Sequence, residues 1–176
     1  GLAPPREGQS DMMMVQGMAP QPAGSPGGRG ITVQGLPLLK PPYGTITAIN
    51  LDKGEILWQI AHGDTPDAVR NSEALKGLDI PRTGQPGTAG TLVTKSLVIA
   101  GDLQVTTIPP RARGAMLRAY NKATGKEVGG ILMPAPQSGS PMTYSVGGKQ
   151  YIVVAVSGGP YSGEYIAYRL PVPSTR

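Results

Sequence analysis

A hairpin motif that occurs twice constrains the fold of this chain more than any other feature. The first copy spans residues 47–58 and the second spans residues 117–128. In each copy an extended run leads into a polar turn that ends in glycine, which supplies the positive φ of a tight hairpin. Counted without gaps, Gly54 aligns with Gly125, 71 positions later. A hairpin repeated at a fixed spacing indicates a repeat architecture.

The composition favours many short strands over helices. The chain has 26 glycines and 19 prolines among 176 residues, close to the level at which low complexity competes with folding. Its Val, Ile, Leu and Tyr residues nevertheless gather in short runs between Gly, Pro and Ser. This pattern is typical of strands joined by turns. There is no cysteine, which excludes disulfides, thiolate metal sites and haem attachment through Cys-x-x-Cys-His.

The charge pattern does not indicate nucleic-acid binding. The net charge is +5, and its densest basic group is Arg111, Arg113 and Arg118, without an aromatic ladder for stacking bases. We predict a solvated basic face and no nucleic-acid partner. No apolar run is long enough to span a membrane, and the start of the chain does not resemble a signal peptide. If the protein is exported, its signal is expected outside this chain.

The apolar runs predict a succession of strands. Residues 1–42, rich in Gly, Pro and Met, are predicted to be a loop or tail. One or two helical turns are expected between Pro66 and Leu75, with Thr65 or Asp64 as the cap. The strands are predicted at residues 45–50, 55–60, 91–94, 97–101, 117–121, 127–132, 141–146, 150–157 and 164–170.

These strands group into sets of two, four and three, which we interpret as parts of four-stranded units. We predict a partial blade at 43–60, an insertion at 61–90, a full blade at 91–132, a partial blade at 141–171 and a tail at 172–176. A blade exposes sheet edges and an apolar face to its neighbours, so these pieces cannot close a ring alone. The predicted fold class is all-β, with antiparallel four-stranded blades of a β-propeller that is incomplete in this chain.

The ordered set of motifs resembles the late blades of quinoprotein dehydrogenases of the membrane glucose dehydrogenase type, which use pyrroloquinoline quinone (PQQ). The resemblance covers about residues 40–171. The stretches that carry it are 41–58, 91–94, 117–127, 141–155 and 157–171.

The resemblance implies an eight-bladed propeller that holds PQQ and calcium near its axis and oxidises an alcohol or sugar in the periplasm. It implies membrane association through a segment outside this chain and an electron acceptor that is a quinone or a cytochrome. The calcium ligands and the catalytic carboxylate would come largely from earlier blades, and the last blade would be completed by a strand from the N-terminal end. The expected partners are the remaining blades, and the chain alone is expected to be inactive.

The chain departs from the family pattern at two positions. The family hairpin usually ends in a Trp that docks between blades; Trp58 fits, but Gly129 stands at the equivalent place in the second copy. Glucose-type members tend to carry His after the final Gly-Gly, whereas Pro160 follows here. Because Pro offers neither a proton nor a donor, this departure speaks against glucose as the substrate.

Two stretches of small residues are candidates for the wall of the cofactor pocket. They are Thr88, Ala89 and Gly90, before a strand, and Gly158, Gly159 and Pro160, after the most apolar strand. Small residues let the backbone approach a ligand, and free N–H groups would suit a quinone carboxylate. An ordinary turn is the alternative interpretation of each stretch.

The other polar residues of the insertion are predicted to be solvated. Its carboxylates alternate with Arg and Lys, so we expect Asp64→Asn or Asp67→Asn to leave activity of the assembled enzyme intact. His62, the single histidine, is predicted to be a surface or loop residue, and no metal ligands are predicted. Two alternatives to an enzyme remain: a non-catalytic propeller module that binds protein or carbohydrate, and a free-standing small β-sandwich.

Overall fold

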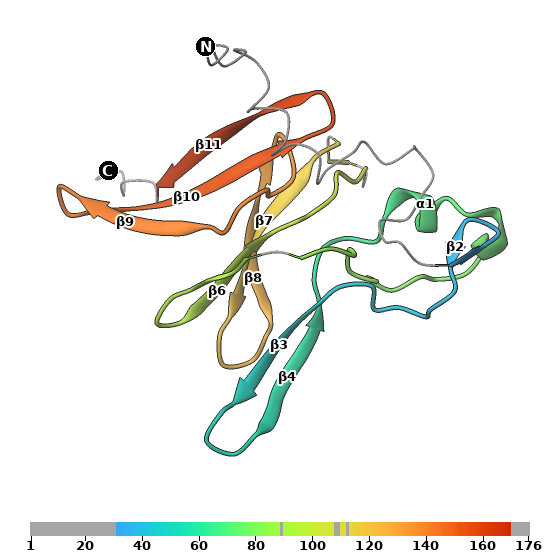
Figure 1. The fold of residues 1–176 in the computed structure, drawn as a ribbon, viewed down its shortest axis with the longest axis horizontal. Helices are drawn as coiled ribbons and strands as arrows, with labels where there is room; N and C mark the ends of the chain where they lie inside the picture. Colours follow the sequence, from blue (N-terminus) through green and yellow to red (C-terminus); the bar gives the residue numbers. More distant parts are fainter. Residues whose placement is uncertain (1–30, 89, 108–109, 112, 170–176) are drawn as a thin grey trace, which may run out of the picture.

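The chain folds almost entirely into antiparallel sheets (Figure 1). The computed structural model describes residues 31–88, 90–107, 110–111 and 113–169. The strands are β1 (Thr32–Val33), β2 (Leu36–Pro37), β3 (Thr45–Asn50), β4 (Glu55–Ala61), β5 (Leu92–Val93), β6 (Leu97–Gly101), β7 (Ala115–Asn121), β8 (Glu127–Met133), β9 (Met142–Val146), β10 (Lys149–Gly158) and β11 (Tyr161–Arg169). The helices are short, α1 (Asp67–Arg70) and a 3₁₀ turn η1 (Glu73–Leu75). The all-β prediction is confirmed.

The sheet order follows the predicted grouping of strands. The central sheet has the order β5-β6-β7-β8, the first large hairpin pairs β3 with β4, and the last sheet has the order β11-β10-β9. Figure 1 shows the central sheet lying between the other two. Because each of these strands pairs with its neighbour in sequence, the sheets are up-and-down units, as blades require.

The two copies of the repeated hairpin have the same local geometry. The side-chain oxygen of Asn50 accepts the amides of Asp52 and Lys53, and that of Asn121 accepts the amides of Ala123 and Thr124. Each turn then closes through a glycine with positive φ, 69° and 71° in the two copies. Asparagine at the start of the turn is therefore the residue that fixes its geometry.

The register confirms the equivalence of Trp58 and Gly129. Trp58 pairs with Ala48, Gly129 pairs with Ala119, and each pair is followed by an irregularity in the ladder. The indole Nε1 of Trp58 donates to the carbonyl of Lys122, 3.0 Å away in the neighbouring sheet. A Cβ at Gly129 would meet no atom within 4 Å, so the second copy lacks this docking contact.

Short and long connections lie at opposite ends of the sheets. Antiparallel pairing places the β5–β6 and β7–β8 turns at one end of the central sheet, and it separates the β9–β10 turn from the β10–β11 turn in the last sheet; Figure 1 shows the tips of the β3–β4 and β7–β8 hairpins pointing the same way. The connections 62–91, 102–114 and 134–141, together with the β10–β11 turn, lie at the other end. Both candidate cofactor stretches therefore belong to the end that carries the long connections.

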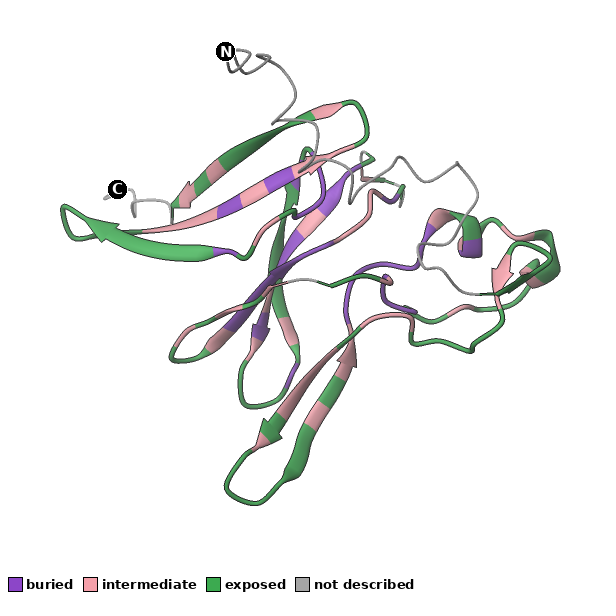
Figure 2. Cartoon of the chain, viewed as in Figure 1, coloured by how far each residue is buried: buried purple, intermediate pink, exposed green. Residues whose placement is uncertain are grey.

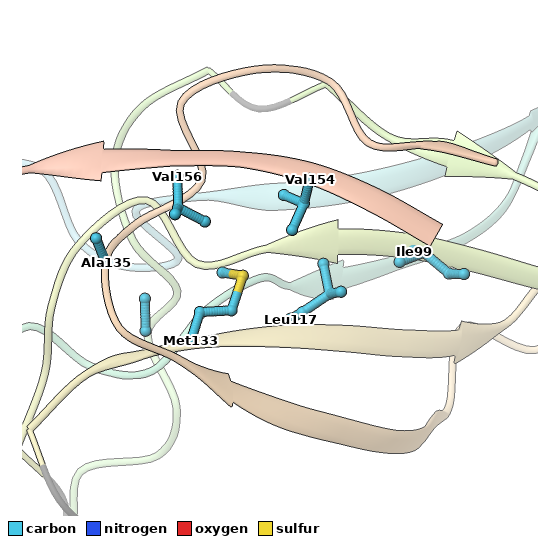
Figure 3. Packing of buried hydrophobic residues seen from close by; sticks show 7 residues of the cluster. Ile99, Leu117, Met133, Ala135, Val154 and Val156 are labelled. Carbon is cyan, nitrogen blue, oxygen red and sulfur yellow. The ribbon is translucent and has the colours of Figure 1, made fainter. Parts of the chain in front are cut away.

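The apolar core lies between the central and last sheets (Figure 3). Val154 and Val156 of β10 are fully buried and point toward the central sheet. The remaining buried members of this cluster are Ile99, Ala115, Leu117, Met133 and Ala135. Each buried Val or Leu contributes about 1.5–3 kcal/mol to folding, so this contact is the main hydrophobic link between the two sheets.

The outer sheets keep open faces and edges (Figure 2). Strand β9 is exposed throughout, and Tyr165 of β11 is 81% exposed. On the first hairpin, Ile49, Ile56 and Leu57 are exposed. Within the described residues, β3 pairs only with β4 and β11 only with β10. Exposed apolar residues on a sheet face, together with an unpaired strand edge, indicate a surface that another sheet covers.

The structure corrects three local predictions. A hairpin, β1–β2, lies within the region predicted as a tail, and its turn has positive φ at Gln34 and Gly35. The strand predicted at 164–170 begins earlier, since β11 starts at Tyr161 and only a short turn separates it from β10. Pro66 is the N-cap of α1, so neither Thr65 nor Asp64 caps it. In the described residues no helix is long and apolar enough to cross a membrane.

Candidate functional site

The two candidate stretches lie at the same end of neighbouring sheets. Thr88 is exposed and Gly90 is half-buried at the approach to β5, while Ala89 lies outside the described residues. Gly158 ends β10 and pairs with Tyr161. Gly159 and Pro160 form the exposed turn between β10 and β11. The exposed members of both stretches are thus available to a ligand.

One connecting loop, residues 134–140, contacts both stretches. A Cβ at Gly90 would lie 1.8 Å from the Oγ of Ser140, so only glycine fits there. On the other side, a Cβ at Gly158 would lie 3.4 Å from Pro136, and its φ of +140° itself favours glycine. The glycines of the two stretches therefore serve close packing against this loop.

Gln137 is the buried polar side chain of this loop, with 4% exposure. Its Nε2 donates to the carbonyl of Gly90 at 2.8 Å, and its Oε1 accepts the amide of Gly101 at 2.5 Å. Its own amide donates to the carbonyl of Asp102, and Gln137 forms an isolated bridge with Val156. One residue thus links the first stretch, the end of β6 and the end of β10.

A network of six charged groups joins the insertion to the central sheet. The Arg118 guanidinium is 2% exposed and contacts the carboxylates of Asp64, Asp102 and Glu127. Two further arginines complete the network: Arg111 donates to Asp64 at 2.8 Å, and Arg82 pairs with Glu127 and Asp64. Three positive and three negative groups compensate one another, so none of these side chains offers free charge to a ligand.

Arg118 uses its full donor capacity. Its Nε and Nη2 donate to the two oxygens of Asp102 at 2.7 and 3.1 Å, and Nη2 also donates to Asp64 at 2.7 Å. Its Nη1 donates to both oxygens of Glu127, at 3.0 and 3.2 Å. Five donors in a rigid fork match these three carboxylates in a way that a lysine cannot.

Two predictions about these charges are wrong. Arg118 is buried, so Arg111, Arg113 and Arg118 do not form one solvated basic face, although Arg113 is exposed. Asp64 is also buried and paired, so it is not a solvated loop carboxylate. Burial raises the pKa of Asp64, but the hydrogen bond from Arg111 and the nearby guanidinium charges outweigh it and hold the pKa below its usual range.

His62 is buried beside this network, contrary to the prediction of a surface or loop position. Its Nε2 lies 3.0 Å from the carbonyl of Gly101, which can only accept, so Nε2 carries the hydrogen. Its Nδ1 then accepts from the hydroxyl of Tyr120 at 2.9 Å. Burial lowers the pKa of His62, which favours this neutral, fully bonded form.

A groove of about 250 Å³ lies between the first hairpin and the segment that leads to β5. Its lining includes Thr45, Thr47, His62, Gln85 and Gly87. It runs along β3, which has no strand partner on its other edge among the described residues. Ala100 and Leu103 complete its lining on the side of the central sheet.

The residues of this end suit a backbone wall for a quinone better than a metal site. Thr88, Gly159 and Pro160 are exposed, so main-chain groups beside them are accessible to a planar, carboxylate-bearing ligand such as PQQ. Within residues 31–88, 90–107, 110–111 and 113–169, no three His, Cys, Asp or Glu side chains gather to hold a metal ion. The carboxylate of Asp64 is already paired with Arg111 and Arg118.

Sequence reasoning missed Gln137 and the charge network. A lone glutamine in a loop carries no periodic signal, and its partners Gly90 and Gly101 are 47 and 36 positions away. The network draws on four separate segments of the chain. The repeated hairpin indicated one pair of this network, because Arg118 and Glu127 flank the second hairpin turn and therefore lie on adjacent strands.

The chain matches the model of the PQQ family, described as the glucose/ethanol/alcohol dehydrogenase β-propeller domain, over residues 3–152. A probable quinate dehydrogenase (quinone) of Xanthomonas campestris pv. juglandis is 36% identical over 151 residues, which cover 81% of this chain and 18% of the relative. A quinoprotein glucose dehydrogenase of Escherichia coli (strain K12) is 33% identical over 146 residues, which cover 78% of this chain and 17% of the relative.

A glycerol dehydrogenase large subunit of Gluconobacter oxydans (strain 621H) is 31% identical over 139 residues, covering 75% of this chain and 17% of the relative. The chain therefore spans less than a fifth of the length of these curated relatives. Their names give three different substrates, so similarity at this level does not select one.

Proposed function

We propose a function from the premise that this chain belongs to the PQQ family of glucose, ethanol and alcohol dehydrogenase β-propeller domains. The chain is the C-terminal portion of a PQQ-dependent dehydrogenase that oxidises an alcohol or a sugar. It contributes the last blades of an eight-bladed propeller and part of the wall of the cofactor pocket. The complete protein works in the periplasm, with membrane association through a segment outside this chain.

The observation that carries this proposal is the incomplete set of sheets. The hairpin β3–β4 corresponds to the outer half of a blade, since its strands align with β7 and β8 of the complete sheet. Among the described residues the last sheet has three strands, β9 to β11, and corresponds to a blade without its outermost strand. The unpaired edges of β3 and β11 would be completed by the remaining blades, one strand of which comes from the N-terminal part of the propeller.

The residues of this chain would bind and orient the cofactor by their backbone. Thr88, Gly90, Gly158, Gly159 and Pro160, together with Ala89, would form the wall. Bound PQQ would supply the oxidising chemistry by accepting the two electrons of the substrate. Calcium, its ligands and the catalytic carboxylate would come from the other blades, and a quinone or cytochrome would accept the electrons.

PQQ binding to the complete protein tests this proposal. We expect the quinone to bind at equilibrium, and a panel of alcohols and sugars to reduce a dye only when PQQ is present. Thr88→Trp places a large side chain on the exposed wall and is expected to weaken PQQ binding at least tenfold. Thr124→Trp, in the β7–β8 turn at the opposite end, is the matched control and leaves binding unchanged.

Two outcomes would reject the proposal. A complete protein that binds no PQQ would favour the alternative, a non-catalytic propeller module that binds protein or carbohydrate. PQQ binding in Thr88→Trp that equals the binding of Thr124→Trp and of the wild type would show that the wall lies elsewhere. Glucose is a poor candidate within the substrate panel, because Pro160 stands where glucose-type members tend to carry His.

A further inference from the structure

We propose that Gln137 is a positioning residue that holds the two stretches of the cofactor wall at a fixed separation. The inference rests on the proposed function of these stretches. Gln137 itself touches neither stretch's exposed surface, since it is 4% exposed and lies behind them. Its role is to connect the backbone before β5 with the backbone that ends β10.

The connection to the first stretch is made by the side chain. The Nε2 of Gln137 donates to the carbonyl of Gly90, and the Oε1 accepts the amide of Gly101. A carbonyl only accepts and an amide only donates, so the reverse orientation of the glutamine amide would lose both bonds. The side chain therefore ties the approach to β5 to the end of β6.

The connection to the second stretch is made by the main chain around Gln137. The amide of Ser157 donates to the carbonyl of Pro136 at 3.0 Å, and the amide of Ser138 donates to the carbonyl of Ala155 at 2.9 Å. Gly158 follows directly and packs against Pro136. The end of β10 is thus fixed to the same loop that carries the Gln137 side chain.

We call these two connections, from the Gln137 side chain to Gly90 and Gly101 and from its loop to the end of β10, the clamp. The side-chain connection requires a glutamine. Glutamate would keep an acceptor for the amide of Gly101 but would lose the donor to Gly90 and set two oxygens against each other. A buried charge would also replace a neutral amide. Gln137→Glu therefore releases the first stretch selectively, while Gln137→Met, of similar volume, removes both bonds.

Gln85 offers a matched control. It is 1% exposed, its Oε1 accepts the amides of Leu103 and Gln104 at 2.9 Å each, and its Nε2 donates to the carbonyl of Gln104 at 3.3 Å. Gln85→Glu therefore makes the same chemical change at equal burial. Its lost donor bond serves the loop at 103–104 and leaves the Gly90 carbonyl unaffected.

Amide hydrogen exchange in the complete propeller that contains this chain tests the clamp. In Gln137→Glu, exchange at residues 90–93 is expected to rise about 10- to 100-fold, while the central strand β7 keeps its wild-type rates. In Gln85→Glu the new carboxylate still accepts the amides of Leu103 and Gln104, and exchange at 90–93 keeps its wild-type rates. Wild-type rates at 90–93 in Gln137→Glu, or an equal rise in β7, would overturn the clamp.

Equilibrium binding of PQQ, measured by dialysis, tests what the clamp is for. We expect Gln137→Glu to bind PQQ at least tenfold more weakly than the wild type. If the wild type binds PQQ and Gln137→Glu binds it equally well, the positioning role is wrong while the proposed function stands. If the wild type binds no PQQ, the proposed function fails and the cofactor role of the clamp with it.

Discussion

Replacing Arg118 by methionine is expected to destabilise the fold more than any other single arginine change in the described structure. Methionine fills much of the volume but leaves Asp102, which is fully buried, and Asp64 without their main counter-charge. Removing one partner of a buried ion pair costs about 3–5 kcal/mol, because the remaining charge stays buried without compensation. Here a single guanidinium serves three carboxylates, so the upper part of that range applies.

This loss can be followed in a urea titration through the fluorescence of Trp58, the single tryptophan of the chain. Its indole donates to Lys122 across the same interface that Arg118 stabilises, so the signal reports on that contact. With an unfolding slope of about 2 kcal/mol per M, a loss of about 4 kcal/mol lowers the midpoint by about 2 M. Arg118→Lys keeps the charge but not the fork of donors, and an intermediate loss is expected.

Arg113→Met is the control for this prediction. Arg113 is exposed, and substitutions of exposed residues usually change stability by about 0.5 kcal/mol or less. If the urea midpoint of Arg118→Met matched that of Arg113→Met, the buried network would contribute nothing to stability. The reasoning from burial and charge compensation would then be refuted.

Three further predictions concern other contacts. Burial lowers the pKa of His62, so this residue's contribution to stability is complete above a pH of about 6.5. The contribution falls at lower pH, because the unfolded chain takes up a proton that the folded chain does not. In His62→Asn the urea midpoint should therefore change less between pH 7 and about pH 5.5 than it does in the wild type. Trp58→Phe loses the exposed bond to Lys122 and should cost about 0.5–1.5 kcal/mol in thermal unfolding, and an unchanged melting temperature would contradict that. Gly129→Val places a side chain in open space on β8 and should stabilise by about 0.5–1 kcal/mol, whereas Gly90→Ala meets Ser140 and should destabilise; a calorimetric result of the same sign for both would be inconsistent with the packing.

The strand content and the repeat could be predicted because their causes are local. Alternation of apolar residues and the Asn and Gly of each turn act within a few positions of the chain, so β3 and β6 begin and end where the sequence predicts. The β1–β2 hairpin was missed because its two strands have two residues each, too few for a periodic pattern.

The candidate site could be predicted only in part. The glycines at 90 and 158 were found from the type of residue and the resemblance, and they do lie against one common loop. Whether they line a PQQ pocket stays a prediction. The burial of His62 and Asp64 was not predictable, because both stand in a polar stretch whose composition indicates exposure.

The sequence by itself determined that the chain forms antiparallel units of up to four strands and that the first and last of these units have fewer than four. Only the tertiary structure decided how the units adhere: one interface is apolar, through Val154 and Leu117, and the other is ionic, through Arg118 and Asp64. The physical reason is that hydrogen bonding along a strand depends on near neighbours, whereas compensation of a buried charge depends on groups that meet only when distant segments fold together.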